Sequence, residues 1–300
     1  MLEFKGRAAF VTGGANGIGL GLARGLLARG CRVVIADIRA DAIAAALETL
    51  DSADAMGVTL DVASRDAFAE AADRAEATLG PVSLLFNNAG VNLFRTIDES
   101  SYDDWDWLLG VNLHGVINGV MTFAPRMKEA GLGGHIVNTA SMASFLCGAS
   151  PGIYATTKFA VRGLSETLRY SLAQHDIGVS VLCPGLVRSH IHASDEIRPA
   201  ALNGNAGPVD EAALERMERL HQSGMTPDLI AERTLDAMAE NRFHIFPNPE
   251  FRDELAGIFD EILADFRDYP PDPSHEQRIA FETIRRDNYA AARRMARERG

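Results

Sequence analysis

The chain has 300 residues, 47% of them apolar, which is enough for one large α/β domain or two smaller ones. A formal net charge of −12 argues against a nucleic-acid ligand, because no basic field covers the protein. Cys31, Cys147 and Cys183 form neither a metal-ligand spacing nor a disulfide framework, and no signal peptide or apolar run of membrane-spanning length is visible, so we expect a cytoplasmic protein with no metal and no membrane partner.

Short apolar runs alternate with longer segments of helical periodicity along most of the chain. The apolar runs predict strands at Arg7–Thr12, Arg32–Asp37, Met56–Val62, Val82–Gly90, Gly134–Ser141, Gly178–Gly185 and His244–Pro249. Helical patterns lie at Ile18–Gly30, 40–50, Asp66–Leu79, roughly Tyr102–Ala130 and Ile153–His175. Such an alternation predicts a parallel sheet with helices on both faces.

Two regions interrupt the alternation. Residues 188–224 are polar and contain Gly, Asn and Pro, and an excursion of this length favours a lid over a site. After Phe251 the pattern is that of an amphipathic helix, followed by an Arg-rich helical tail. We therefore expect a main domain over 1–250 and a helical extension over 251–300, whose tail is either a solvated helix or a contact with a partner subunit.

A glycine-rich turn joins the first predicted strand to the first helix. In "TGGANGIG", Thr12–Gly19, the glycines Gly13, Gly17 and Gly19 permit a tight turn and a close approach of the backbone to a ligand. The amides at the start of the following helix favour an anion. Because the turn has this position between a strand and a helix, it predicts dinucleotide binding rather than a simple chain reversal.

Asp37 ends the second predicted strand, 18 residues after Gly19. A carboxylate at this position accepts hydrogen bonds from adenosine ribose hydroxyls and repels a 2′-phosphate, which favours NAD over NADP. Asn16 in the glycine turn adds no positive charge, but Arg39 lies two residues after Asp37 and leaves NADP as the alternative.

Tyr154 and Lys158, in "YATTK", are four residues apart and would share one face of a helix. A nearby ammonium stabilises a phenolate, so this tyrosine could exchange a proton with a carbinol or carbonyl oxygen. The alternative is an unrelated surface pair. Ser141 at the end of the fifth strand, "NNAG" at Asn87–Gly90 and the polar Asn112 within an apolar helix argue for a site, and we expect a water to bridge Asn112 and Lys158.

Together these motifs resemble the short-chain dehydrogenase/reductase family, in family order over roughly residues 5 to 250. The resemblance implies one doubly wound Rossmann-type domain with a seven-stranded parallel sheet and a hydride transfer between NAD and a secondary alcohol or ketone. It implies that Tyr154 is the acid/base, that Lys158 holds the nicotinamide ribose, that Ser141 orients the substrate oxygen and that Asn112 anchors a water. The implied cofactor-binding residues are Gly13, Asn16, Gly17, Ile18, Gly19, Asp37, Asp61, Val62, Asn88, Ala89, Gly90, Tyr154, Lys158, Pro184, Gly185, Val187 and Ser189.

The substrate end of the site is expected to be mostly apolar and therefore to take a bulky, uncharged alcohol or ketone such as an aryl, aryl-ether or steroid compound. The residues expected there are Ser141, Met142, Tyr154, Phe94, Phe145 and His190, with Asn92, Leu93, Leu146, Cys147 and Ile191 beside them. The C-terminal half also resembles, more loosely, aryl-ether Cα-dehydrogenases. We expect a homodimer or homotetramer. An NADPH-dependent carbonyl reductase and a non-catalytic nucleotide sensor remain the alternative functions.

Overall fold

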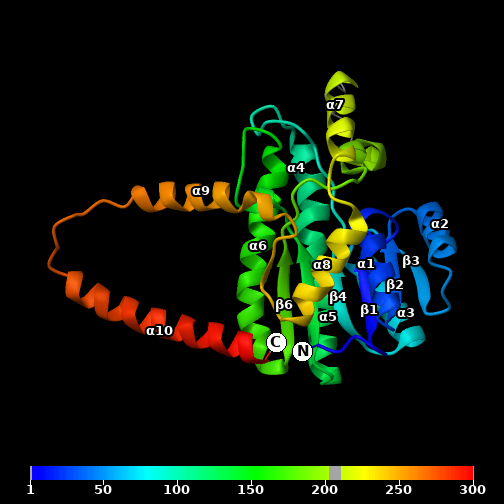
Figure 1. Cartoon of the computed structure of the whole chain (residues 1–300), viewed down its shortest axis with the longest axis horizontal. Helices are drawn as coiled ribbons and strands as arrows, with labels where there is room; N and C mark the ends of the chain where they lie inside the picture. Colours follow the sequence, from blue (N-terminus) through cyan, green and yellow to red (C-terminus); the bar gives the residue numbers. More distant parts are fainter. Residues whose placement is uncertain (1, 203–210, 300) are drawn as a thin grey trace.

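A computed structural model describes residues 2–202 and 211–299. Its centre is a parallel sheet of seven strands in the order β3-β2-β1-β4-β5-β6-β7 (Figure 1). This confirms the predicted fold class. The strands are β1 Ala8–Thr12, β2 Arg32–Asp37, β3 Ala55–Thr59, β4 Val82–Asn87, β5 Gly134–Thr139, β6 Ile177–Leu182 and the two-residue β7 His244–Ile245. Several strands end earlier than predicted, because the polar residues that follow them turn into the loops at the carboxyl edge.

Helices cover both faces of the sheet. The main helices are α1 Gly17–Ala28, α2 Ala40–Leu50, α3 Arg65–Leu79, α4 Tyr102–Leu109, α5 Gly115–Ala130, α6 Gly152–Leu172, α7 Glu211–Gln222, α8 Pro227–Ala239, α9 Arg252–Ala264 and α10 His275–Arg299. Short 3-10 turns are η2 Met142–Ser144, η3 Ala173–His175, η4 Ile191–Ile197, η5 Ala200–Leu202 and η6 Pro249–Phe251, and η1 Gly110–His114 is π-helical.

Successive side chains of β1 point to opposite faces of the sheet, so the strand contributes to two hydrophobic cores. Phe10 packs with Phe68 and Phe123 beneath α3 and α5, with ring centroids 4.9 to 6.3 Å apart. Val11 faces the other way, toward a core built with Leu22 of α1 and with α8. Local signals fix several helix starts, such as Ser64, which accepts from the backbone of Ala67 at the start of α3.

The helix from Tyr102 to Ala130 is long and apolar enough to cross a membrane by length and composition. More than half of its apolar window is buried inside the fold, because α5 packs against the sheet. The π-helical turn η1 joins α4 to α5 without a break, so the helix is continuous from Tyr102 to Ala130. This π-helical turn was not predicted.

The strand order reverses next to β1, where β4 lies on the other side from β2. Crevices at the carboxyl edge of such a reversal are the usual ligand sites of open α/β sheets. The chain also leaves this main body after η6, since α9 and α10 extend away from it (Figure 1). The division into a domain over 1–250 and an extension over 251–300 stays a prediction.

Candidate active site

The glycine turn lies between β1 and α1 and is held closely by β4. Asn88 donates from Nδ2 to the carbonyl oxygens of Thr12 and Gly13, at 3.1 and 3.3 Å. Thr12 Oγ1 accepts from the backbone amides of Asn88 and Ala89. A Cβ on Gly19 would lie 2.0 Å from the carbonyl oxygen of Gly13, so a side chain there is excluded. The turn is therefore a rigid, open cradle of backbone groups.

A cavity of about 730 Å³ opens along the carboxyl edge of the sheet from this turn. Sixteen of the seventeen residues expected to bind the cofactor line it, namely Gly13, Asn16, Gly17, Ile18, Asp37, Asp61, Val62, Asn88, Ala89, Gly90, Tyr154, Lys158, Pro184, Gly185, Val187 and Ser189. Gly19 is the exception, since it packs beneath the turn instead of lining the wall. The sequence motifs thus converge on one continuous space.

Asp37 lies at the end of β2 at one end of this cavity. Its side chain is only 10% exposed, and its carboxylate accepts from the amides of Ala15 and Arg39 at 3.4 and 3.2 Å. The Arg39 Nε atom lies 4.0 Å from Asp37 Oδ1. Both side chains line the cavity, so a carboxylate and a guanidinium meet any ligand that enters here.

Tyr154, Lys158 and Ser141 come together in the middle of the cavity. Lys158 is almost fully buried on α6, lies 5.4 Å from the centroid of the Tyr154 ring, and donates from Nζ to the carbonyl oxygen of Thr139 at 2.8 Å. Burial lowers the pKa of Lys158 to about 8. Burial also raises the pKa of Tyr154 above its ordinary value, although a hydrogen bond with Ser141 lowers it. In the free protein, burial therefore sets the direction of the Tyr154 pKa shift, and the expected lowering by the ammonium is not among its causes.

Asn112 sits in the π-helical turn η1, and its amide is held by the protein. Oδ1 accepts from the amide of Val91 at 2.8 Å, and Nδ2 donates to the Val91 carbonyl oxygen and to Thr157 Oγ1. These partners, rather than the expected water, account for the burial of the amide. Asn112 does not line the cavity, but a Cβ on Gly90 would lie 3.4 Å from Asn112 Oδ1 and 3.5 Å from Lys158 Nζ. Its role as a water anchor stays a prediction.

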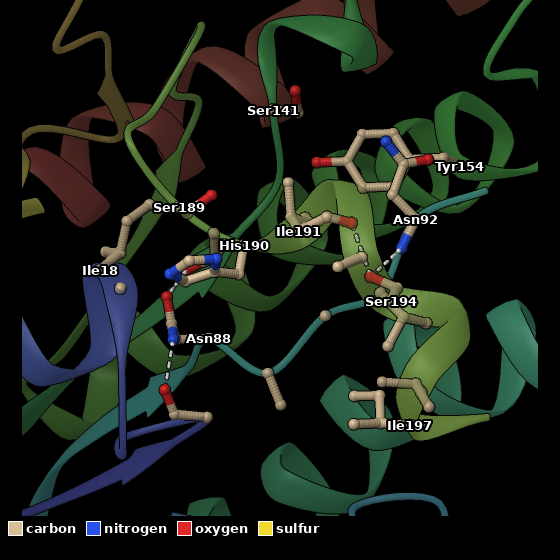
Figure 2. A pocket seen from close by; sticks show the side chains of 18 of the residues that line it. Ile18, Asn88, Asn92, Ser141, Tyr154, Ser189, His190, Ile191, Ser194 and Ile197 are labelled. Carbon is tan, nitrogen blue, oxygen red and sulfur yellow. Dashed lines mark hydrogen bonds between the residues drawn. The ribbon is translucent and has the colours of Figure 1, made fainter. Parts of the chain in front are cut away.

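Beyond Tyr154 the cavity continues along the segment from His190 to Leu202, of which His190, Ile191, Ser194 and Ile197 are labelled in Figure 2. Side chains of α7 also line it, and those that the structure describes begin at Glu215. Residues 203–210 of the expected lid, 188–224, lie outside the described residues. The lid is tied to the body, because Arg198 pairs with the buried Asp104 of α4 at 2.6 Å and Ser194 Oγ accepts from the amide of Asn92 at 3.1 Å. The walls there are mainly apolar and include Trp107, Ile191, Ile197, Leu202, Met217 and Leu220.

Of the residues expected at the substrate end, Ser141, Met142, Tyr154, Phe94, His190, Asn92 and Ile191 line the cavity. Leu93, Leu146 and Cys147 do not line it. Phe145 does not line it either, and this expectation was wrong. Its ring packs under the Arg162 guanidinium at 3.9 Å and against Phe246 and Phe259, centroids 5.6 and 6.5 Å away. The Phe145 side chain points away from the cavity because the chain after β7 returns over it and supplies these aromatic partners.

Two polar residues that the sequence did not single out, Thr12 and Thr157, support the site. Thr12 and Thr157 hold the glycine turn and Asn112, respectively. Asn92 lines the cavity near Tyr154 and Ser194 (Figure 2), and its Oδ1 is buried with no hydrogen-bond partner among the described residues. Asn92 lies two residues after the "NNAG" motif and is one of the residues expected at the substrate end.

Comparison with known proteins agrees with this geometry. The family model for short chain dehydrogenases matches residues 7–199. A "C alpha-dehydrogenase" of Sphingobium sp. strain SYK-6 is 39% identical over 276 residues, covering 91% of this chain and 90% of the relative. Two solved structures are similar over most of their length. One is a short-chain dehydrogenase from Novosphingobium aromaticivorans (56% identity, 99% of this chain and 100% of that one, TM-score 0.86). The other, from Burkholderia phymatum, is in complex with NAD (37% identity, 90% and 99%, TM-score 0.85).

These likenesses exclude the non-catalytic sensor, and they support a small-molecule alcohol as the substrate and NAD(P) as the cofactor. The chain is a member of the short-chain dehydrogenase/reductase family, an oxidoreductase that acts on CH–OH groups.

Proposed function

We propose that this protein is an NAD-dependent dehydrogenase that interconverts a bulky, uncharged secondary alcohol and its ketone. One observation carries the proposal. A single cavity runs from the glycine turn and Asp37, past Tyr154 and Ser141, into an apolar chamber beneath the lid. A space of about 730 Å³ with this lining holds a dinucleotide's reactive end and a large apolar substrate next to each other.

The residues present fit a dinucleotide. The cradle at Gly13 and Gly19 admits no side chain at either position, because an added Cβ would lie 2.9 Å or less from a neighbouring backbone atom, and its wall is therefore bare backbone. The nearly buried carboxylate of Asp37 would accept hydrogen bonds from ribose hydroxyls and repel a 2′-phosphate. Lys158 would bind the second ribose. When bound, NAD supplies the hydride chemistry.

The protein's own chemistry is proton transfer at one oxygen. Tyr154 would take the proton of the substrate hydroxyl in the oxidation and return it in the reduction. Ser141 would hold the same oxygen. Lys158, whose Nζ lies 5.4 Å from the centroid of the Tyr154 ring, would stabilise the phenolate. Because the pKa of Tyr154 lies above its ordinary value, the phenol is protonated in the free protein at neutral pH. Oxidation should therefore accelerate as pH rises.

The substrate class follows from the chamber walls. Trp107, Ile191 and Leu220 present apolar surface, while the carboxylates of Asp106 and Glu196 oppose an anionic substrate. The unpartnered Oδ1 of Asn92 favours a ligand with a second hydroxyl, since a buried acceptor without a donor is costly. An aryl-ether alcohol combines these features. The similarity to a "C alpha-dehydrogenase" supports this choice.

Initial rates with a substrate series test the proposal. We expect an aryl-ether benzylic alcohol with NAD to give a kcat/KM at least about tenfold above that of 2-propanol, since each apolar contact in such a pocket discriminates by about this factor. Equal or higher efficiency with 2-propanol would contradict the substrate class. The alternative is an NADPH-dependent carbonyl reductase, favoured by Arg39 at the cavity wall, and a preference for NADPH would establish it.

Two expectations from the sequence remain proposals of the same kind. The thiols Cys31, Cys147 and Cys183 are all unpaired, which supports a reducing, cytoplasmic compartment. A homodimer or homotetramer is proposed from the family membership.

A further inference from the structure

The C-terminal arm, residues 252–299, consists of α9, a connecting segment over 265–274 and α10. Figure 1 shows that both helices extend away from the sheet and are joined at the far end of the arm by the connecting segment. α9 contacts the body as far as its middle, where Phe259 packs against Phe145, with ring centroids 6.5 Å apart. α10 joins it near its end, where Arg169 and Asn241 donate to the carbonyl oxygen of Ala296.

The far part of the arm, residues 262–284, exposes seven large apolar side chains. Phe266 and Tyr269 are 80% and 78% exposed. The other five are Ile262, Leu263, Ile279, Phe281 and Ile284. Single exposed apolar residues are ordinary, but so many within 23 consecutive residues mark a surface that another molecule covers.

The two halves of the arm carry opposite charge. Residues 252–272 contain seven carboxylates and two arginines, a formal net charge of −5, while residues 275–299 contain seven arginines and four carboxylates, a formal net charge of +3. α9 and α10 are spread apart within one chain, so this complementarity is not used between them (Figure 1). A two-fold axis, which presents the same surface of both molecules to each other, would use it twice.

We propose that the C-terminal arm is an assembly element that binds a second copy of this chain, with α9 of one protomer against α10 of its partner across a two-fold axis. The arm is self-complementary in both respects. The acidic half of one protomer meets the basic half of the other, and the apolar side chains at the far ends are covered together. The inference is independent of the substrate and the cofactor.

Mass measurements on the full-length chain test it. In analytical ultracentrifugation at micromolar concentration, we expect Phe266→Glu combined with Phe281→Glu to halve the mass of the assembly. Leu132→Glu is the matched control, because Leu132 is 57% exposed and lies outside the arm, and it should leave the mass unchanged. A monomeric wild-type chain, or an unchanged mass in the double variant, would overturn the proposal.

Charge reversal tests the pairing of the two halves and does not depend on the apolar variants. One protein carries Asp260→Arg, Glu261→Arg and Asp265→Arg, which change the formal net charge of residues 252–272 from −5 to +1. The other carries Arg286→Glu and Arg294→Glu, which change that of residues 275–299 from +3 to −1. All five residues are exposed. Each protein alone would set like charges against each other across the axis and should show half the wild-type mass, whereas an equimolar mixture should regain the full mass as a mixed dimer. Failure of the mixture to associate would show that the acidic half does not meet the basic half. Circular dichroism confirms that each variant is folded.

Discussion

Asp37 offers the sharpest test of cofactor choice, through the substitution Asp37→Ala. The carboxylate is nearly buried at the cavity wall, so its hydrogen bonds to ribose hydroxyls would be poorly replaced by water. Hydrogen bonds to a charged group contribute about 1.5–3 kcal/mol each. At about 1.4 kcal/mol per factor of ten, loss of one such bond should lower kcat/KM for NAD at least about tenfold.

The same substitution should improve the use of NADP. It removes a negative charge that would lie near the 2′-phosphate, and it frees Arg39, whose Nε lies 4.0 Å from Asp37 Oδ1, to pair with that phosphate. The assay is kcat/KM with both cofactors for the wild type, for Asp37→Ala and for the control Asp41→Ala. Asp41 is an exposed carboxylate on α2 that does not line the cavity, so its loss should leave the ratio unchanged. A wild type that already prefers NADP, or a ratio that Asp37→Ala does not change, would refute the reasoning.

Lys158→Ala should weaken NAD binding and raise the pH at which oxidation is half-maximal, because the phenolate of Tyr154 loses its neighbouring cation; an unchanged NAD affinity and pH–rate profile would remove the assigned role. His135 is fully buried beside Ser180, and burial lowers its pKa to about 3. Below pH 6.5 the unfolded chain binds a proton at this residue and the folded chain does not until about pH 3, so its stabilisation is present above pH 6.5 and is lost as pH falls. The free energy of unfolding in urea should therefore be lower at pH 5 than at pH 7.5, and this decrease should be smaller by about 2 kcal/mol in His135→Gln than in the wild type. Equal decreases in both proteins would contradict the linkage. Gly19→Ala should abolish NAD binding and lower the melting temperature, because its Cβ would lie 2.0 Å from a backbone oxygen of the turn; a variant that binds NAD normally would show that the turn is not rigid.

Much of the sheet could be predicted because its signals are local. Each buried strand is a short apolar run, and the glycines of the turn after β1 have one mechanical use at that position. The seven parallel strands and the meeting of Tyr154, Lys158 and Ser141 follow from these runs and from the family motifs.

What the sequence could not show depends on remote partners. Asn112 was expected to need a water, but Val91 and Thr157 satisfy its amide from segments far away in the chain. Phe145 looked like a pocket residue, yet the chain after β7 returns to pack on it. The residues 188–224 were interpreted as a polar excursion, although "EAALERMERLHQ" forms α7, with Met217 and Leu220 at the cavity.

The central claim is that Tyr154 transfers the proton in an NAD-dependent oxidation of a secondary alcohol, and Tyr154→Phe tests it most directly. The change removes one oxygen and keeps the ring that packs beside Lys158. Turnover of the alcohol with NAD should fall at least about 10²-fold, the lower end of general acid–base contributions, while the Kd for NADH, measured by fluorescence titration, should stay near the wild-type value. A Phe variant that keeps nearly wild-type turnover would contradict the account.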